Sequence, residues 1–155
     1  MGDEIFNTTG AGQSHAQTVA PNVKAKYLVR FYNDGNAEDT FILTGTAAQS
    51  GWSVTYVDHA TGADITSAVT GAGWTTPAVA PRAYRRIKVT VSTPADATTA
   101  LTRPMLLTGT STSDASKSDT AKAETTCFID PRPDALINDW DIGGYVGDGI
   151  VNDDG

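Results

Sequence analysis

Carboxylates at the two ends of the chain are the side chains best suited to chemistry, and their type indicates calcium binding. Asp3 and Glu4 lie at the head, and seven of the last 26 residues are Asp. Calcium takes about six to eight oxygen ligands, which carboxylates on loops supply readily. The residues expected to bind the metal are Asp3, Glu4, Asp139, Asp141 and Asp148.

Two short segments of the tail resemble parts of calcium-binding loops. Residues 139–143 have the Asp-x-Asp-x-Gly spacing of such a loop, and residues 148–152 resemble the second half of a dockerin or EF-hand loop. Gly144 and Val146 stand where an EF-hand needs its first two side-chain ligands, which excludes a complete EF-hand. Two interpretations remain open, a solvated acidic linker and calcium bridging between domains.

The other reactive side chains are isolated from one another. His15 and His59 have no second His or Cys at ligand spacing, and the sequence contains neither a G-x-S-x-G motif nor a phosphate-binding loop. Cys127 is the single cysteine, so we expect a small buried apolar residue and no internal disulfide. Residues 7–9 form an N-glycosylation sequon, which gives Asn7 as a candidate glycan site. The sequence therefore predicts a protein that is not an enzyme.

Two further groups of side chains could form binding surfaces. Trp52, Trp74 and Trp140 could stack on sugar rings, although Trp52 lies in an expected strand and is expected in the core. The basic cluster of the sequence consists of Arg82, Arg85, Arg86 and Lys88. On an alternating strand the last two of these share the solvent face. Such a cluster either keeps a solvated sheet edge from aggregating or receives the acidic tail of another copy.

Length and charge exclude several classes of partner. The chain has 155 residues, enough to bury a core without disulfides or metals, and its net charge is −7. An acidic protein repels nucleic-acid phosphates and anionic membranes. No stretch approaches the roughly 20 apolar residues of a membrane span, and the first residues lack the pattern of a signal peptide. We therefore expect no nucleic acid and no membrane insertion and, if the protein is exported, a mature chain or a fragment.

Apolar and polar residues alternate with the period of a β-strand, and helical periodicity is scarce. The clearest half-buried strands are predicted at residues 24–31 and 86–92. Weaker alternation predicts further strands at residues 14–19, 40–44, 52–57, 105–110 and 120–128. Clusters of Asn, Gly, Pro and Asp separate these segments and indicate tight turns. About seven short strands with frequent turns predict an all-β sandwich.

Several motifs carry a family resemblance. Residues 33–41 contain an N-x-G-N-x-x-D-x-F reversal, and Gly-Trp-Ser-Val at 51–54 follows it. Residues 79–91 contain a proline-led strand start, with Arg82 in place of the usual glycine. These motifs resemble bacterial and archaeal surface immunoglobulin-like domains of the NEW3, CARDB and DUF11 types. The resemblance covers residues 14–128 and implies an immunoglobulin-like antiparallel β-sandwich of about seven strands and an extracellular, cell-surface context.

The end of the chain differs from the sandwich in its composition. Pro131 and Pro133 force extended geometry on the residues before them, which predicts an extended C-terminal tail. Burying a large apolar side chain contributes about 1.5–3 kcal/mol, so we expect the apolar residues of the tail and head to dock on a sandwich. This expected assembly interface consists of Ile5, Phe6, Leu136, Ile137, Trp140, Ile142, Tyr145, Val146 and Ile150.

The tail also repeats the head. The pattern Gly-Asp-x-Ile-x-Asn at residues 2–7 recurs at residues 147–152, a separation of 145 residues that suits a tandem array. We therefore expect a junction segment at 1–13, a sandwich at 14–128 and a linker or tail at 129–155. The predicted function is a structural subunit or repeat of an extracellular filament or stalk, which assembles with copies of itself from head to tail. The alternative is an adhesion or carbohydrate-binding accessory module of a large secreted protein.

Overall fold

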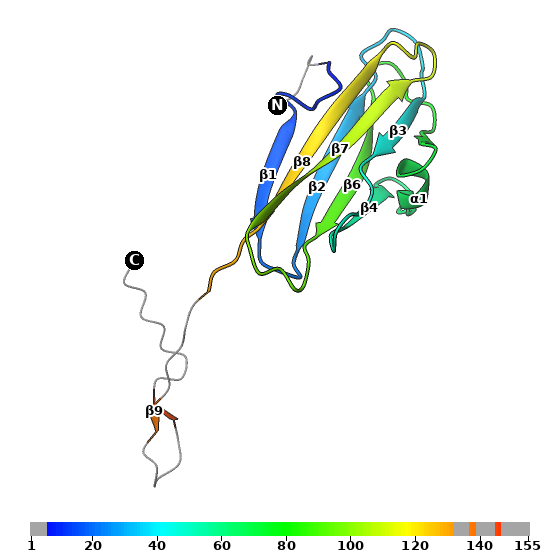
Figure 1. Cartoon of the computed structure of the whole chain (residues 1–155). Helices are drawn as coiled ribbons and strands as arrows, with labels where there is room; N and C mark the ends of the chain where they lie inside the picture. The colour runs from blue at the N-terminus through cyan, green and yellow to red at the C-terminus, as the bar shows by residue number, and fades with distance from the viewer. Residues whose placement is uncertain (1–5, 132–136, 139–144, 147–155) are drawn as a thin grey trace.

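The computed structural model describes residues 6–131 and two short strands of the tail, residues 137–138 and 145–146. Residues 6–131 fold into two β-sheets with one single-turn helix, α1 (Thr66–Val69) (Figure 1). The strands are β1 (Ser14–Val19), β2 (Lys24–Tyr32), β3 (Phe41–Gly45), β4 (Ser53–Asp58), β5 (Trp74–Thr75), β6 (Tyr84–Ser92), β7 (Leu101–Ser111) and β8 (Ser118–Cys127). A strand lies at each of the seven positions that alternation predicted, and β5 adds an eighth, because Trp74 and Thr75 pair with β3.

One sheet has the strand order β1-β8-β7-β3-β5 and the other the order β2-β6-β4. All pairs in these sheets are antiparallel except β1 with β8, which run parallel from Ser14 beside Lys122 to Val19 beside Cys127. The expectation of a wholly antiparallel sandwich is therefore wrong at this edge. The parallel pair results from the short turn at 20–23, which places the end of β1 beside the start of β2. Because β8 also ends at this end of the sandwich, β1 and β8 run in the same direction.

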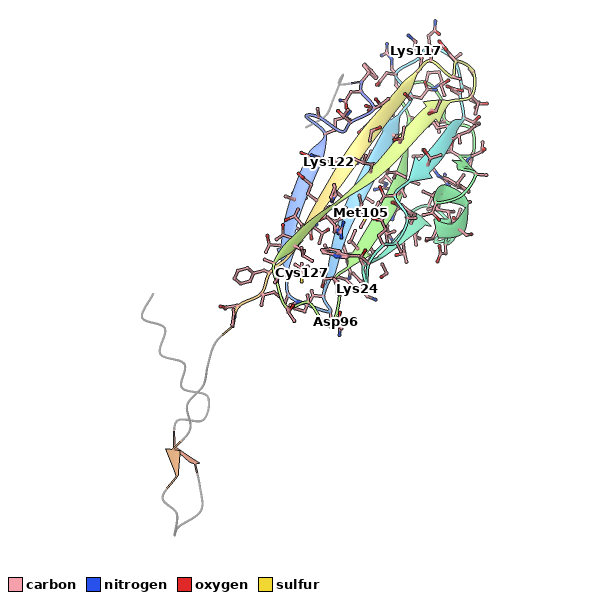
Figure 2. The ribbon with its side chains drawn as sticks, in the orientation of Figure 1. Lys24, Asp96, Met105, Lys117, Lys122 and Cys127 are labelled. Carbon is pink, nitrogen blue, oxygen red and sulfur yellow. The ribbon has the colours of Figure 1, made fainter. Side chains whose placement is uncertain are left out.

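The core lies between the two sheets and is built from the inward positions of the alternating strands. On the central strand β6, the side chains of Ile87, Val89 and Val91 are almost completely buried. Met105 and Cys127 contribute to the same core from the larger sheet (Figure 2). The burial of Trp52 and Cys127 confirms two expectations, and the core also contains Leu43, Val54, Tyr56 and Leu107.

Two proline-led turns of the same sequence type introduce the paired strands β2 and β6. In the turns 20–23 and 80–83, the N–H of the last residue donates to the carbonyl of the first, at 3.3 and 3.0 Å. The third residues, Asn22 and Arg82, have φ of 59° and 62°, as a type II turn requires after proline. Arg82 therefore adopts the left-handed conformation that glycine more commonly takes at this position of such a turn.

The described part of the tail forms a small antiparallel pair. β9 (Ile137–Asn138) pairs with β10 (Tyr145–Val146), with Tyr145 opposite Asn138. Among the described residues, no helix has the length and apolar character that crossing a bilayer would require.

Candidate functional site

The outer face of the three-stranded sheet gathers five of the eleven Lys and Arg residues of the chain. These five residues, here called the basic face, are Lys24, Lys26, Arg30, Arg86 and Lys88. They come from β2 and β6, at the positions whose neighbours along the strand point into the core. No Asp or Glu occupies an outward position on β2, β6 or β4. The basic face is thus a positive surface on a protein of net negative charge.

The two arginines of the basic face lie directly opposite each other across the strand pair. The guanidinium carbons of Arg30 and Arg86 lie 5.2 and 5.7 Å from the centre of the same tyrosine ring, that of Tyr84. Tyr32 packs against Tyr84 with the ring centres 5.0 Å apart, and Arg30 Nη1 donates to the Tyr32 hydroxyl at 3.3 Å. Like charges that face each other destabilise a strand pair, and the cation–π contacts offset part of that cost.

The cations of the basic face have no carboxylate partner within the described part of the chain. The two ion pairs found there join Arg85 to Asp58 and Lys122 to Glu124, the latter at 3.4 Å. His59 lies next to this face, because its N–H donates to the carbonyl of Arg86. Burial lowers the pKa of His59, and the positive charges of Arg86 and Lys88 lower it further. The face therefore disfavours added positive charge and favours an anion.

The structure divides the basic cluster that the sequence indicated. Arg86 and Lys88 share the solvent face, as predicted. Arg82 lies in the turn before β6, and Arg85 points inward to Asp58. The remaining members of the face come from β2, which the sequence did not connect with β6. Lys24, Lys26 and Arg30 stand at even-numbered positions and so share one face of β2, which the sequence could have indicated. Only the β2–β6 register shows that this face lies beside Arg86.

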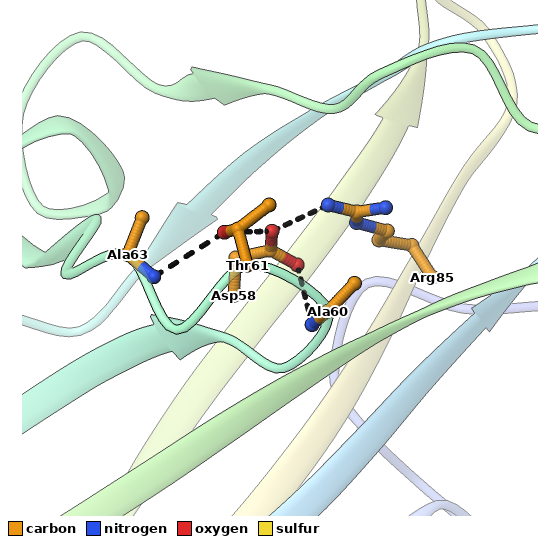
Figure 3. Close-up of polar contacts among 5 residues, drawn as sticks. All are labelled: Asp58, Ala60, Thr61, Ala63 and Arg85. Atoms are coloured by element: carbon orange, nitrogen blue, oxygen red, sulfur yellow. Dashed lines mark hydrogen bonds and ion pairs between the residues drawn. The ribbon is translucent and has the colours of Figure 1, made fainter.

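A buried ion pair lies at the end of β4 (Figure 3). The Asp58 carboxylate is only 1% exposed and accepts hydrogen bonds from the Arg85 guanidinium and, at 2.5 Å, from the Thr61 hydroxyl. Burial acts to raise the pKa of Asp58, but these donors and the N–H of Ala60 outweigh it and hold the pKa below its usual value. A charged carboxylate held in this way anchors the loop 58–63.

The head of the chain is docked on β8 through a second carboxylate, Asp119. Its Oδ1 accepts from the Asn7 N–H at 3.1 Å and from Gln13 Nε2 at 2.5 Å. Gly10 has φ of +72°, and a Cβ there would lie 2.7 Å from the Cβ of Lys122. Asp119 lies just before the strand predicted at 120–128, and the spacing of the head offered no signal for this contact.

The candidate glycan site takes part in this head loop. Asn7 Oδ1 accepts from the N–H groups of Thr9 and Ala11 at 2.9 and 3.1 Å. Asn7 Nδ2 donates to the Ala11 carbonyl at 2.9 Å. The Asn7 amide therefore shapes the loop, and a glycan on Nδ2 would have to keep or replace that last hydrogen bond.

Most of the expected metal ligands and interface residues lie outside the described residues. This holds for all five expected calcium ligands, Asp3, Glu4, Asp139, Asp141 and Asp148, and for Ile5, Leu136, Trp140, Ile142 and Ile150. Ile137, Tyr145 and Val146 are described only as backbone of β9 and β10. Phe6 is described and is 68% exposed. Among the described residues, no group of three or more His, Cys, Asp or Glu side chains is arranged to hold a metal ion.

The candidate aromatic platform and the two histidines are also placed by the structure. Trp52 is buried in the core, and Trp74 is half-buried on the edge strand β5, so these two rings do not form an exposed stacking surface. His15 lies edge-on to the ring of Tyr27, with ring centres 6.1 Å apart. Tyr27 in turn uses its hydroxyl to donate to the Glu124 carbonyl at 2.8 Å, which ties the two sheets together.

No protein-family model matches the sequence, and no curated protein matches it. A family 123 glycoside hydrolase from Clostridium perfringens is similar in structure, with 7% identity and a TM-score of 0.49 over 79% of this chain and 24% of the hydrolase. PapD-like domain 7 of human CEP192 has 9% identity and a TM-score of 0.41 over 74% of this chain and 79% of the domain. The VesB protease of Vibrio cholerae has 14% identity and a TM-score of 0.44 over 76% of this chain and 30% of the protease. The chain thus spans less than a third of the two enzymes, and similarities of this size carry no argument about activity.

Proposed function

We propose that this chain is a structural repeat or subunit of an extracellular filament or stalk, in which immunoglobulin-like sandwiches join head to tail. The observation that carries the proposal is the docked head. Its sequence pattern at residues 2–7 recurs at 147–152, and the first copy of the pattern ends in Asn7, which is held by Asp119. The second copy of the pattern, residues 147–152, would take the same place on the next sandwich, in exchange for the head of that sandwich.

Exposed apolar residues at both ends of the sandwich support end-to-end contact. Phe6 is 68% exposed at the head. At the opposite end, where the chain leaves β8, Leu101 is 44% and Phe128 50% exposed (Figure 1). Exposed apolar groups of this kind favour protein–protein contact. A contact between two different ends is heterologous. Such contacts build an open fibre when the rotation from one copy to the next does not close a ring.

The assembly proposal is tested on the full chain by sedimentation velocity at increasing concentration and by electron microscopy. Asn152→Ala removes the counterpart of the loop-forming Asn7 and should weaken association by about tenfold, the effect of about 1.4 kcal/mol. Asp153→Ala, outside the repeated pattern, is the matched control and should change association little. A chain that stays monomeric at every concentration, or that is equally affected by both substitutions, would contradict head-to-tail joining through this pattern.

Calcium at the junction is a separate part of the proposal. Head and tail carboxylates would meet when copies join, and several unpaired carboxylates brought together favour a divalent cation. Association and melting temperature should therefore rise with calcium and fall with EDTA. If excess EDTA changes neither, pairing of the carboxylates with Lys or Arg replaces the calcium interpretation.

The second candidate function is an adhesion or carbohydrate-binding accessory module. The exposed ring pair of Tyr32 and Tyr84 beside two guanidiniums favours it, because sugars stack on such rings. Glycan-array binding that is lost in Tyr84→Ala, without self-association of the chain, would favour this module over the structural repeat.

A further inference from the structure

Protection of a sheet edge explains only part of the charge of the basic face, the three cations on the edge strand β2. Charged residues on edge strands prevent pairing with other sheets, but β6 is the central strand of its sheet. Two of the five cations, Arg86 and Lys88, lie on this protected strand. Arg30 also faces Arg86 directly, an arrangement that destabilises the free sheet. A face with this cost and without carboxylate partners in the described residues is suited to an anionic ligand.

The geometry of the face suits an extended chain. Lys24, Lys26, Leu28, Arg30 and Tyr32 stand at every second residue of β2, so they follow one another at about 6.6–6.8 Å. An extended peptide presents its own alternate side chains at the same spacing. Leu28, between Lys26 and Arg30, is 48% exposed, and Tyr32, beyond Arg30, is 44% exposed, so the face offers apolar contacts as well as charge. A compact anion would use only one or two of these groups.

The chain itself carries a segment with the complementary charge. Residues 129–155 contain seven Asp and one Arg, together with a Trp and a Tyr. Their negative charge matches the five cations of the basic face, and their aromatic residues match its exposed tyrosines. Prolines at 131 and 133 favour an extended backbone in the first part of this segment, and further on the strands β9 and β10 are extended as well, paired with each other. The segment leaves from the end of β8, in the opposite sheet, whereas the basic face is the outer face of the β2–β6–β4 sheet.

We propose that the basic face is the docking surface for the acidic tail, residues 129–155, of a second copy of the chain. The inference rests on the proposed head-to-tail assembly and names the surface that receives the tail. Carboxylates of the tail pair with Lys26, Arg30 and Lys88, and its aromatic residues pack on the exposed tyrosines. Binding of this kind weakens as salt screens the charges.

The test measures binding of a labelled synthetic peptide, residues 129–155, to the full chain by fluorescence anisotropy at low and high salt. The double substitution Lys26→Glu and Lys88→Glu reverses two exposed charges of the basic face and should weaken binding by about tenfold or more. The matched control, Arg103→Glu and Lys117→Glu, makes the same change of net charge in the other sheet, on β7 and, at Lys117, just before β8 (Figure 2). The control should weaken binding by less than about threefold, because net charge alone acts only at long range.

A second measurement does not depend on the folding of the variants. A peptide in which all seven Asp are Asn should lose binding to the unaltered chain. Equal weakening in both double variants, unchanged binding, or loss only in the Arg103 and Lys117 variant would overturn the proposal. The proposal would also be overturned if the chain bound a sulfated polysaccharide at the basic face but did not bind the peptide. If self-association survives the Lys26 and Lys88 substitutions, the basic face is not the docking surface, but the head-to-tail assembly still stands. If the chain binds the peptide but never self-associates, the head-to-tail assembly is contradicted.

Discussion

The ion pair of Asp58 and Arg85 gives the sharpest test of what holds the described domain together. The Asp58 carboxylate is almost completely buried, and Arg85 is 18% exposed. Arg85 Nε is buried and has no hydrogen-bond partner among the described residues, so its guanidinium depends on Asp58 for compensation. The substitution Asp58→Asn keeps the size of the side chain and removes its charge.

Removing one partner of a buried pair costs about 3–5 kcal/mol, because it leaves the other charge uncompensated. Since Arg85 reaches some solvent, we expect the lower end, about 3 kcal/mol. For a domain of this length, 1 kcal/mol changes the melting temperature by about 2–4 °C, so the expected decrease is about 6–12 °C. Arg85→Met removes the stranded cation, and the two substitutions together should cost less than their sum.

The assay is urea unfolding at neutral pH, followed by fluorescence of the buried Trp52. Asp96→Asn is the control, since Asp96 is exposed and its loss of charge is the same. Because the pKa of Asp58 is lowered in the folded state, its contribution is present above about pH 4 and is lost as pH falls through the folded pKa. Asp58→Asn should therefore flatten the loss of stability below about pH 4.

Two results would refute this reasoning. One is a cost of Asp58→Asn below about 1 kcal/mol, the size of an ordinary neutral hydrogen bond. The other is strict additivity of the Asp58 and Arg85 substitutions, which would show that the two side chains stabilise the fold independently.

Three further predictions concern other parts of the molecule. Gly109→Ala places a Cβ 2.7 Å from the buried ring of Phe31 and should destabilise the fold by about 1–3 kcal/mol in urea unfolding, whereas no change would mean that the ring moves freely. Asp119→Ala should release the head loop, so that its amides exchange hydrogen about tenfold faster while the melting temperature of the sandwich stays nearly unchanged. Equal protection in the variant and the unaltered chain would contradict docking through this carboxylate. The pKa of His59, measured by NMR titration, should lie below its usual value and rise in Lys88→Gln, because one nearby positive charge is removed; a constant pKa would show that burial alone sets it.

The sequence was sufficient to locate the strands and their buried faces. The period of two in residues 24–31 and 86–92 assigned Tyr27, Ile87 and Val89 to the core, where the structure has them. This works because successive side chains on a strand point to opposite faces, so that a local pattern reports which face meets water. The proline-led turn before β6 was readable too, since proline restricts the backbone locally, whereas the matching turn at 20–23 before β2 was not predicted.

The tertiary structure decided which strands pair and which side chains meet. Alternation cannot say that β1 runs parallel to β8, or that β2 lies beside β6 in the register that opposes Arg30 and Arg86. It also could not show that Arg85 turns inward to Asp58, or that Asp119 holds the head. These contacts join residues far apart in the chain, and they form only when the whole sandwich closes. The faces of the strands are therefore local properties of this sequence, whereas the basic face, the ion pair and the docked head are products of the closed fold.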